Sequence, residues 1–219
     1  MTIQVSAPTD LSAVNRMLAS VGQAPVTAID TEEFTNEDGV TQEIQTNPEV
    51  AIAINTLSEV SREVQAMGWT FNFEYNVTYT PDPATKYIQV PFNIIQMDAS
   101  QNVASNRSLD LIRKNGRMWD RIAQTDQFEK PIQFDIILMY NWEDLPIPIQ
   151  DYIVAQASAV FAQRVTGDPQ QVQMLEQKAL QCRTYALEYE TQQGDYTFFG
   201  QTRNGNPYIS YEPFHALRR

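Results

Sequence analysis

The stretch Trp142-Glu143-Asp144 is where residue types and spacing come nearest to a catalytic site. Two carboxylates roughly 5 to 10 Å apart are sufficient for glycoside hydrolysis, and an aromatic ring can stack on a sugar. However, Asp144 lies two residues before Pro146, and an acidic residue before a helix is also typical of a capping turn. We favour the structural interpretation and keep an envelope glycan hydrolase that uses acidic residues as the alternative function.

Other enzymatic chemistry lacks the residues that it requires. The only histidine is His215, close to the C-terminal end, and the only cysteine is Cys182. A catalytic triad, a histidine metal site or a thiolate cluster therefore needs residues that one chain does not provide. Cys182 lies in an apolar helical seam, which favours a buried structural thiol over a nucleophile. We expect no enzymatic activity, no cofactor and no metal site.

Residues 30–46 are the most acidic stretch, with six acidic residues and no basic one. Their spacing does not fit a calcium-binding loop, which needs alternating ligands before a glycine and a glutamate at a fixed distance after it. The stretch also shows little hydrophobic periodicity. We therefore interpret residues 30–46 as a solvated loop.

The composition favours a protein whose surface is covered by other proteins. The 219 residues include 15 basic and 27 acidic ones, and the net charge of −12 argues against tight binding of nucleic acid. Glutamine occurs 22 times, and arginine outnumbers lysine by 11 to 4. Protein interfaces favour arginine and exclude lysine, and uncharged amides are easier to bury than charges. No stretch is apolar enough to span a bilayer, so we expect no membrane association.

Helix signals occur on both sides of the middle of the chain. A capping residue or a proline marks each start and a glycine marks each end, which predicts helices at residues 10–22, 47–68, 149–167 and 168–194. In the last of these, six residues at spacings of three and four predict a packing seam: Val172, Leu175, Ala179, Cys182, Ala186 and Tyr189.

Residues 69–141 are predicted to be β structure. From Trp69 to Tyr79, aromatic or branched residues alternate with polar ones, which predicts a strand with one buried face. Asn115-Gly116 is typical of a two-residue hairpin turn that pairs Ile112 with Trp119 and Asp110 with Arg121. Shorter strands are expected at residues 87–90, 92–97 and 132–140.

These elements predict an α+β fold, in which an antiparallel β module is inserted between two helical pairs that form a four-helix bundle. The expected domains are an N-terminal helical pair (residues 1–68, with the acidic loop 30–46), the β module (69–141), a helical hairpin (142–193) and an extended C-terminal arm (194–219).

The C-terminal arm is unusually aromatic and has no long helical or strand period. Its rings need to be buried, either on the chain's own helices or in grooves of a partner protein, where aromatics and arginine are frequent anchors. We favour the partner. The expected partner-binding residues are Tyr196, Phe198, Phe199, Tyr208, Tyr211, Phe214, Arg218 and Arg219.

Four blocks of sequence, in this order and spacing, resemble one family of phage proteins. They are LSAVNRMLASVGQAPV (11–26), GWTFN (68–72), GRMWDRIAQTDQF (116–128) and EDLPIPIQDYIVAQASAVFAQRVTGD (143–168). The resemblance is to tail tubular protein A, the head-to-tail adaptor or connector of short-tailed phages (podoviruses). None of the blocks is a catalytic motif.

The resemblance implies a structural virion protein of the phage tail, made in the cytoplasm of the bacterial host. Twelve copies would form a ring below the portal, and the tail nozzle, built of tail tubular protein B, would attach beneath it. Tail fibres are a further candidate partner. DNA would pass through the lumen during ejection without specific binding, and the C-terminal arm would reach toward the portal.

Overall fold

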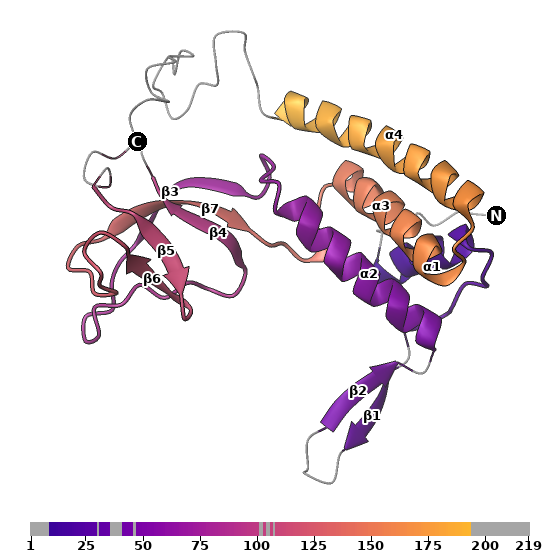
Figure 1. The fold of residues 1–219 in the computed structure, drawn as a ribbon, viewed down its shortest axis with the longest axis horizontal. Helices are drawn as coiled ribbons and strands as arrows, with labels where there is room; N and C mark the ends of the chain where they lie inside the picture. Colours follow the sequence, from indigo (N-terminus) through magenta and orange to yellow (C-terminus); the bar gives the residue numbers. More distant parts are fainter. Residues whose placement is uncertain are drawn as a thin grey trace, which may run out of the picture.

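The computed structural model describes residues 9–29, 31–35, 41–45, 47–100, 103, 106 and 108–193. In these residues the chain combines four α-helices with small antiparallel sheets, which is the α+β class that the sequence predicts. Figure 1 shows the helices on one side of the molecule and strands β3 to β7 on the other. Each side has its own cluster of buried apolar residues.

The first two helices begin where the local signals place them and end a few residues before the glycines that were expected to close them. Helix α1 spans Asp10–Ser20, and the Thr9 and Ser12 side chains form a reciprocal capping box at its start. Helix α2 spans Pro48–Gln65, with the Asn47 side chain accepting a hydrogen bond from Glu49 N. Because these caps satisfy backbone N–H groups that have no partner within the helix, they fix the start of each helix.

Helices α3 (Ile147–Val165) and α4 (Pro169–Gln193) form the expected pair. Gly167 adopts a φ of 66° in the turn between them, and the Asp168 carboxylate accepts a hydrogen bond from Gln170 N at the start of α4. Helix α3 packs against α1, α2 and α4, and buried residues of all four helices belong to one apolar cluster.

Residues 30–46 were expected to be a loop, and this expectation is wrong for most of them. Strand β1 (Thr31–Thr35) pairs antiparallel with strand β2 (Thr41–Gln45), in a two-stranded sheet of its own. Phe34, Ile44 and the threonines at the strand ends favour β structure. The high acid content hid this signal, because glutamate is depleted in strands and frequent in solvated loops.

The β side contains a three-stranded sheet with the order β3-β7-β4 and a separate two-stranded sheet, β5-β6. All of these pairs are antiparallel. The strands are β3 (Phe73–Tyr79), β4 (Ile94–Ala99), β5 (Leu111–Lys114), β6 (Arg117–Asp120) and β7 (Ile132–Leu138). The expected strand at residues 87–90 forms only isolated bridges, from Tyr87 to Gln127 and from Gln89 to Arg117.

The Asn115-Gly116 hairpin is confirmed together with its register. Both turn residues have positive φ values, 52° and 73°, as a turn of type I′ requires. Ile112 pairs with Trp119. Asp110 and Arg121 lie just beyond the end of the ladder that is far from the turn. Arg121 N donates a hydrogen bond to Asp110 O at 2.8 Å, and the two side chains form an ion pair at 3.5 Å.

The strand predicted from Trp69 to Tyr79 is shorter and less regular than expected. Residues 69–72 form a turn, and the Trp69 ring joins the helical core, where its Nε1–H donates to Val64 O at 2.6 Å. Strand β3 then begins at Phe73, and a register shift between Glu74 and Val77 interrupts the alternation. Packing in the helical core outweighs strand propensity at the start of this segment.

The chain passes between the helical side and the β side twice, from α2 to β3 and from β7 to α3. The buried amide side chains of Asn72 and Gln65 form hydrogen bonds with these two crossing segments. Asn72 Oδ1 accepts a hydrogen bond from Trp69 N at 2.8 Å. Asn72 Nδ2 donates to Gln65 O and to Leu138 O, both at 2.9 Å. Gln65 Oε1 accepts from Tyr140 N at 2.8 Å, on the chain that leads from β7 back to α3. Hydrogen bonds of these two side chains therefore connect the helical side to the β side at both crossing segments. We call this region the joint.

Candidate assembly interface

Helix α4 lies at the edge of the helical side and buries only short side chains. Ala179, Cys182 and Ala186 are its buried residues, and α3 is the element with which it makes its main contact. Alanines on α3, such as Ala155 and Ala159, are also buried. Small residues on both helices allow a close approach, so the packing seam predicted for α4 is confirmed at its central positions.

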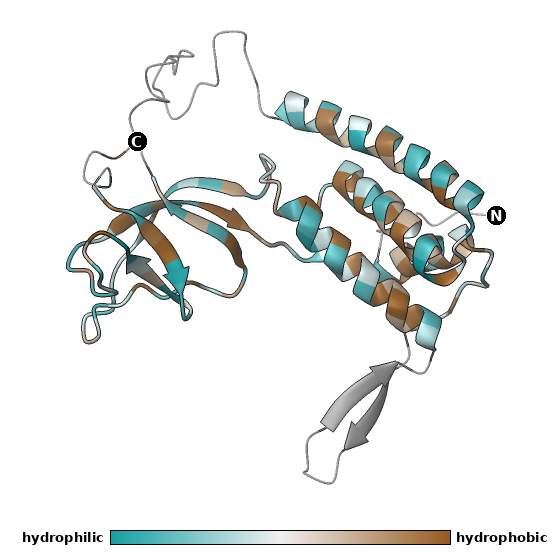
Figure 2. Ribbon diagram, in the orientation of Figure 1, coloured by the Kyte–Doolittle hydropathy of each residue, from teal (hydrophilic) through white to brown (hydrophobic). Residues whose placement is uncertain are grey.

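Several of the longer apolar side chains of α4 are exposed. Met174 is 73% exposed, Tyr185 62% and Leu180 61%. Figure 2 shows hydrophobic positions recurring along the whole length of α4, which is the most peripheral helix in this view. A helix that is apolar on several sides is normally covered on several sides, because exposed apolar area is unfavourable in water. The outer surface of α4 is therefore a candidate interface.

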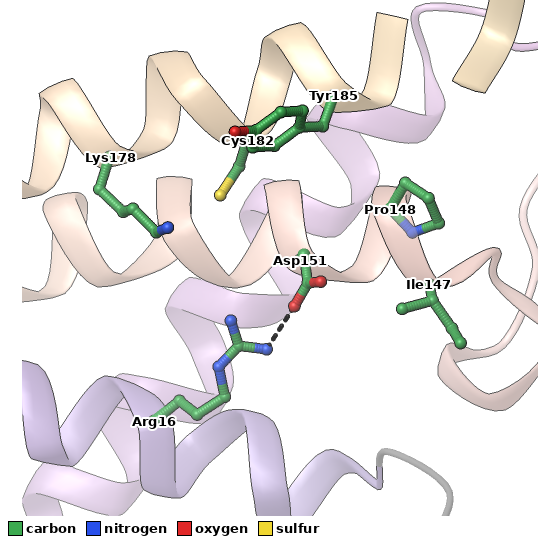
Figure 3. Close-up of a pocket in the computed structure, with 7 residues that line it drawn as sticks. All are labelled: Arg16, Ile147, Pro148, Asp151, Lys178, Cys182 and Tyr185. Atoms are coloured by element: carbon green, nitrogen blue, oxygen red, sulfur yellow. Dashed lines mark hydrogen bonds and ion pairs between the residues drawn. The ribbon is translucent and has the colours of Figure 1, made fainter. Parts of the chain in front are cut away.

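A cleft of about 290 Å³ lies between α1, α3 and α4 (Figure 3). Arg16 Nη1 and Asp151 Oδ1 form an ion pair across it at 2.7 Å. In the close-up, Tyr185 lies beside Cys182, and the Lys178 side chain extends from α4 toward the cleft. The lining residues are Arg16, Ile147, Pro148, Asp151, Lys178, Cys182 and Tyr185.

The small volume and the exposed apolar lining of this cleft suit the side chains of a partner protein better than a small ligand. Small-molecule sites usually enclose about 300 to 1,000 Å³, so this cleft is at or below the lower end of that range. Ile147 at its rim is 64% exposed. A lining of apolar residues with a few charges resembles the anchor pockets of protein interfaces.

The β side carries exposed apolar residues of its own. Phe92 is 97% exposed and Ile122 is 69% exposed. The segment of Phe92 is held in place, because Met139 N donates to Asn93 O at 2.7 Å. An aromatic ring that is almost fully exposed on a bonded segment is a further candidate contact.

The residues predicted to bind a partner lie outside the part of the chain that the structure describes. All eight of them, from Tyr196 to Arg219, fall in residues 194–219. The exposed apolar residues of α4 were missed, because the sequence pattern was interpreted as one packing seam. The signal that could have found them is the presence of Met174, Leu180 and Leu187 outside that seam.

The structure gives the Trp142-Glu143-Asp144 cluster no enclosed site. These residues form a 3₁₀ turn before α3, with both carboxylate residues exposed. The Trp142 ring packs against the helical core, and its main-chain oxygen accepts a hydrogen bond from Gln150 Nε2 at 2.7 Å. The arrangement is that of a turn that leads into a helix, and it supplies nothing that favours hydrolysis.

Among the residues that the structure describes, no group of three or more histidine, cysteine or acidic side chains is placed to hold a metal ion. Within the same residues, no helix is both long and apolar enough to cross a bilayer.

Comparison with known proteins gives the family. The model of a family described as Tail tubular protein matches residues 11–196. Tail tubular protein A of Klebsiella phage KP34 is 27% identical over 164 residues, which covers 73% of this chain and 75% of that protein. The match spans both the helical side and the β side and includes all four blocks that carried the resemblance. The chain therefore belongs to the tail tubular protein family of phage tail structural proteins.

Proposed function

We propose that this protein is a ring-forming head-to-tail adaptor, which links the portal to the tail nozzle and forms part of the DNA ejection channel. The observation that carries the proposal is the exposed apolar surface of α4, in a chain that belongs to a family of phage tail proteins. A ring needs two different faces on each subunit that fit one another. The outer surface of α4 is suited to be one of them.

The partners that we propose for the adaptor are those that the resemblance to tail tubular protein A implies. We propose a ring of twelve copies with the portal above, tail tubular protein B below and tail fibres as a further contact. The arm at residues 194–219 would hold the portal through its aromatic rings and Arg218 and Arg219. The helices of residues 1–68 and 142–193 would act as one four-helix bundle, with residues 69–141 as the β module.

The charge of the chain suits a conduit for DNA. With 27 acidic and 15 basic residues, the subunit does not favour tight retention of phosphates. DNA would therefore pass through the lumen without specific binding. No catalytic residue is required for this role, and no membrane association is expected in the assembled virion.

The proposal is tested by the mass of the particle that the purified chain forms, alone and after mixing with purified portal protein. Native mass spectrometry is expected to give a mass of twelve copies that associates with the portal. A chain that stays monomeric at every concentration and never binds the portal contradicts the proposal.

A matched pair of variants tests whether α4 is the contact. Leu180→Glu places a charge on an exposed apolar position and is expected to weaken ring formation. Gln181→Glu adds the same charge to the neighbouring exposed position and is expected to have a smaller effect. Equal assembly of both variants and the wild type would exclude the outer surface of α4 as a subunit contact.

A further inference from the structure

The β5–β6 hairpin concentrates positive charge in a chain that is otherwise strongly acidic. Residues 111–121 contain four basic residues and one acidic residue, a net charge of +3, whereas the whole chain has −12 and the rest of it therefore −15. The acidic residue, Asp120, is 5% exposed, and its carboxylate accepts hydrogen bonds from Ile122 N and Ala123 N. The exposed charge of residues 111–121 is therefore positive.

The two faces of this hairpin differ in burial. Successive residues of a strand point to opposite faces. By the strand register, Leu111 and Met118 share one face, and both are buried in the core of the β side. Lys114 lies opposite Arg117 on the other face, next to Trp119. Lys114 is exposed and the Arg117 side chain is 42% exposed, so this outer face presents two cations to the surroundings of the subunit.

Aromatic rings hold both cations in place without removing their charge. Lys114 Nζ lies 4.4 Å from the centroid of the Trp119 ring, and Arg117 Cζ lies 4.0 Å from that of Tyr87. Arg117 also forms an ion pair with Asp126 at 3.5 Å, whereas Lys114 forms no salt bridge within the described part of the chain. Like charges at opposed strand positions repel one another, so an anion near Lys114 and Arg117 would relieve this repulsion.

The tip of the hairpin adds a third cation. Arg113 is exposed, its Nη1 donates to Ile94 O at 3.2 Å, and it too has no salt bridge among the described residues. Figure 1 shows the hairpin on the β side, away from the helices. A two-stranded ribbon is narrow enough to enter the major groove of DNA, so the width of this basic hairpin does not prevent close approach to a duplex.

We propose that the outer face and the tip of the β5–β6 hairpin contact the phosphate backbone of the DNA that passes through the ring. This inference rests on the proposed adaptor function, for which it assigns the surface that faces the duplex. A duplex carries one negative charge for about every 1.7 Å of its axis, which suits closely spaced cations. Contacts to phosphates carry no sequence information, so they agree with a duplex that slides. Equivalent hairpins around the ring would hold the duplex at the centre of the lumen, while the acidic remainder of the chain limits its retention.

Acetylation of lysines tests the contact in rings of the full chain. Lys130 and Lys178 are exposed and lie outside the hairpin, so they serve as internal controls for Lys114. Rings are treated with an acetylating reagent at low salt, with and without a short DNA duplex, and the modification of each lysine is measured by mass spectrometry. We expect the duplex to slow the acetylation of Lys114 severalfold and to leave the two controls unchanged.

The other outcomes of this experiment are distinguishable. Rings in which the duplex leaves Lys114 unprotected, or protects all lysines equally, would overturn the hairpin proposal and leave the adaptor function intact. Protection of Lys114 by ring formation alone, without DNA, would assign this face to a contact between subunits and would also overturn the proposal. Absence of any ring would contradict the adaptor function, and the hairpin proposal with it.

A matched pair of variants tests the role of the charge. Lys114→Gln removes one cation from the hairpin of every copy, and rings of this variant are expected to bind the duplex roughly tenfold more weakly and with a smaller salt dependence, because fewer counterions are released. Lys130→Gln makes the same change at an exposed lysine of the β side and should bind like the wild type. Equal affinity and salt dependence of the two variants, with ring mass and circular dichroism unchanged, would refute the proposed contact.

Discussion

Replacement of Asn72 by alanine is expected to destabilise the protein at the joint between its helical and β sides. The variant loses the three hydrogen bonds of this fully buried side chain, at 2.8, 2.9 and 2.9 Å. Trp69 N would be left without its side-chain partner, at a cost of about 1–3 kcal/mol, and the two lost donations cost about 0.5–1.5 kcal/mol each. Gln65 O keeps a second hydrogen bond from Gly68 N, which limits the loss at that carbonyl. The free energy of unfolding should fall by about 3 to 4 kcal/mol.

Thermal unfolding followed by circular dichroism measures this loss. For a chain of this size a change of 1 kcal/mol shifts Tm by about 2–4 °C, so the Tm of Asn72→Ala should fall by about 6 to 16 °C. Asn141→Ala is the matched control. Asn141 lies on the crossing segment from β7 to α3, is exposed, and makes no side-chain capping hydrogen bond. Its replacement should change the free energy of unfolding by less than about 0.5 kcal/mol. If Asn72→Ala unfolds at the same temperature as this control, the bonded joint contributes nothing to stability.

Asn72→Asp sharpens the test, because it keeps the shape of the side chain and removes the two donated hydrogens. A carboxylate beside the oxygens of Gln65 and Leu138 would be disfavoured, so its pKa in the folded state should be raised. The variant should then be least destabilised below the ordinary pKa of aspartic acid, about 3.9, and should lose stability as the pH rises through the raised folded value. A variant as stable as the wild type at neutral pH would refute the assigned donor role.

Three further predictions concern single positions. Gly68→Ala should destabilise the protein by more than Gly22→Ala, because both glycines have positive φ values but only a Cβ at position 68 would come within 3.0 Å of Ile137 Cδ1; equal Tm values for the two variants would contradict this. Asp82 has a pKa below its ordinary value of 3.8 because hydrogen bonds from the following turn stabilise its carboxylate, so the stability that it contributes should be present above that value and lost as the pH falls through the lowered one. An NMR titration that gives an unshifted midpoint, or an Asp82→Asn variant with an unchanged acid limb, would contradict this. Ala186→Leu, at a fully buried position between α4 and α3, should cost about 1–3 kcal/mol by overpacking, and an unchanged urea midpoint would show that α4 does not pack as described.

Elements with local signals were predictable from the sequence. Asn47-Pro48 and Asp168-Pro169 mark the starts of two helices, because their side chains and fixed φ satisfy or remove backbone donors in the first turn. Asn115-Gly116 fixed the pairing of Ile112 with Trp119, because a turn of type I′ allows only one register. In each case the determining interaction lies within a few residues.

Elements that depend on distant contacts were not predictable in the same way. Trp69 leaves the expected strand because its indole N–H reaches Val64 O and its ring enters the helical core. Asn72 was expected on the solvated face of a strand, yet it is buried by its bonds to Gln65 and Leu138. Alternation of apolar and polar residues does not show whether a residue is buried in the core of the β side or in the core of the helical side.

The candidate interface was hidden for a related reason. On α4 the buried positions Ala179, Cys182 and Ala186 have small side chains, and the close packing that they allow against α3 leaves Leu180 and Tyr185 on the flanks. From sequence alone, an apolar residue on any side of a helix can be assigned to the core. Only the position of α3 shows which apolar residues of α4 are left exposed by the described part of the subunit. That exposed surface would favour aggregation of a free chain. In the proposed ring, burial between subunits would remove this surface from water, so the residues that disfavour the isolated subunit would favour its assembly.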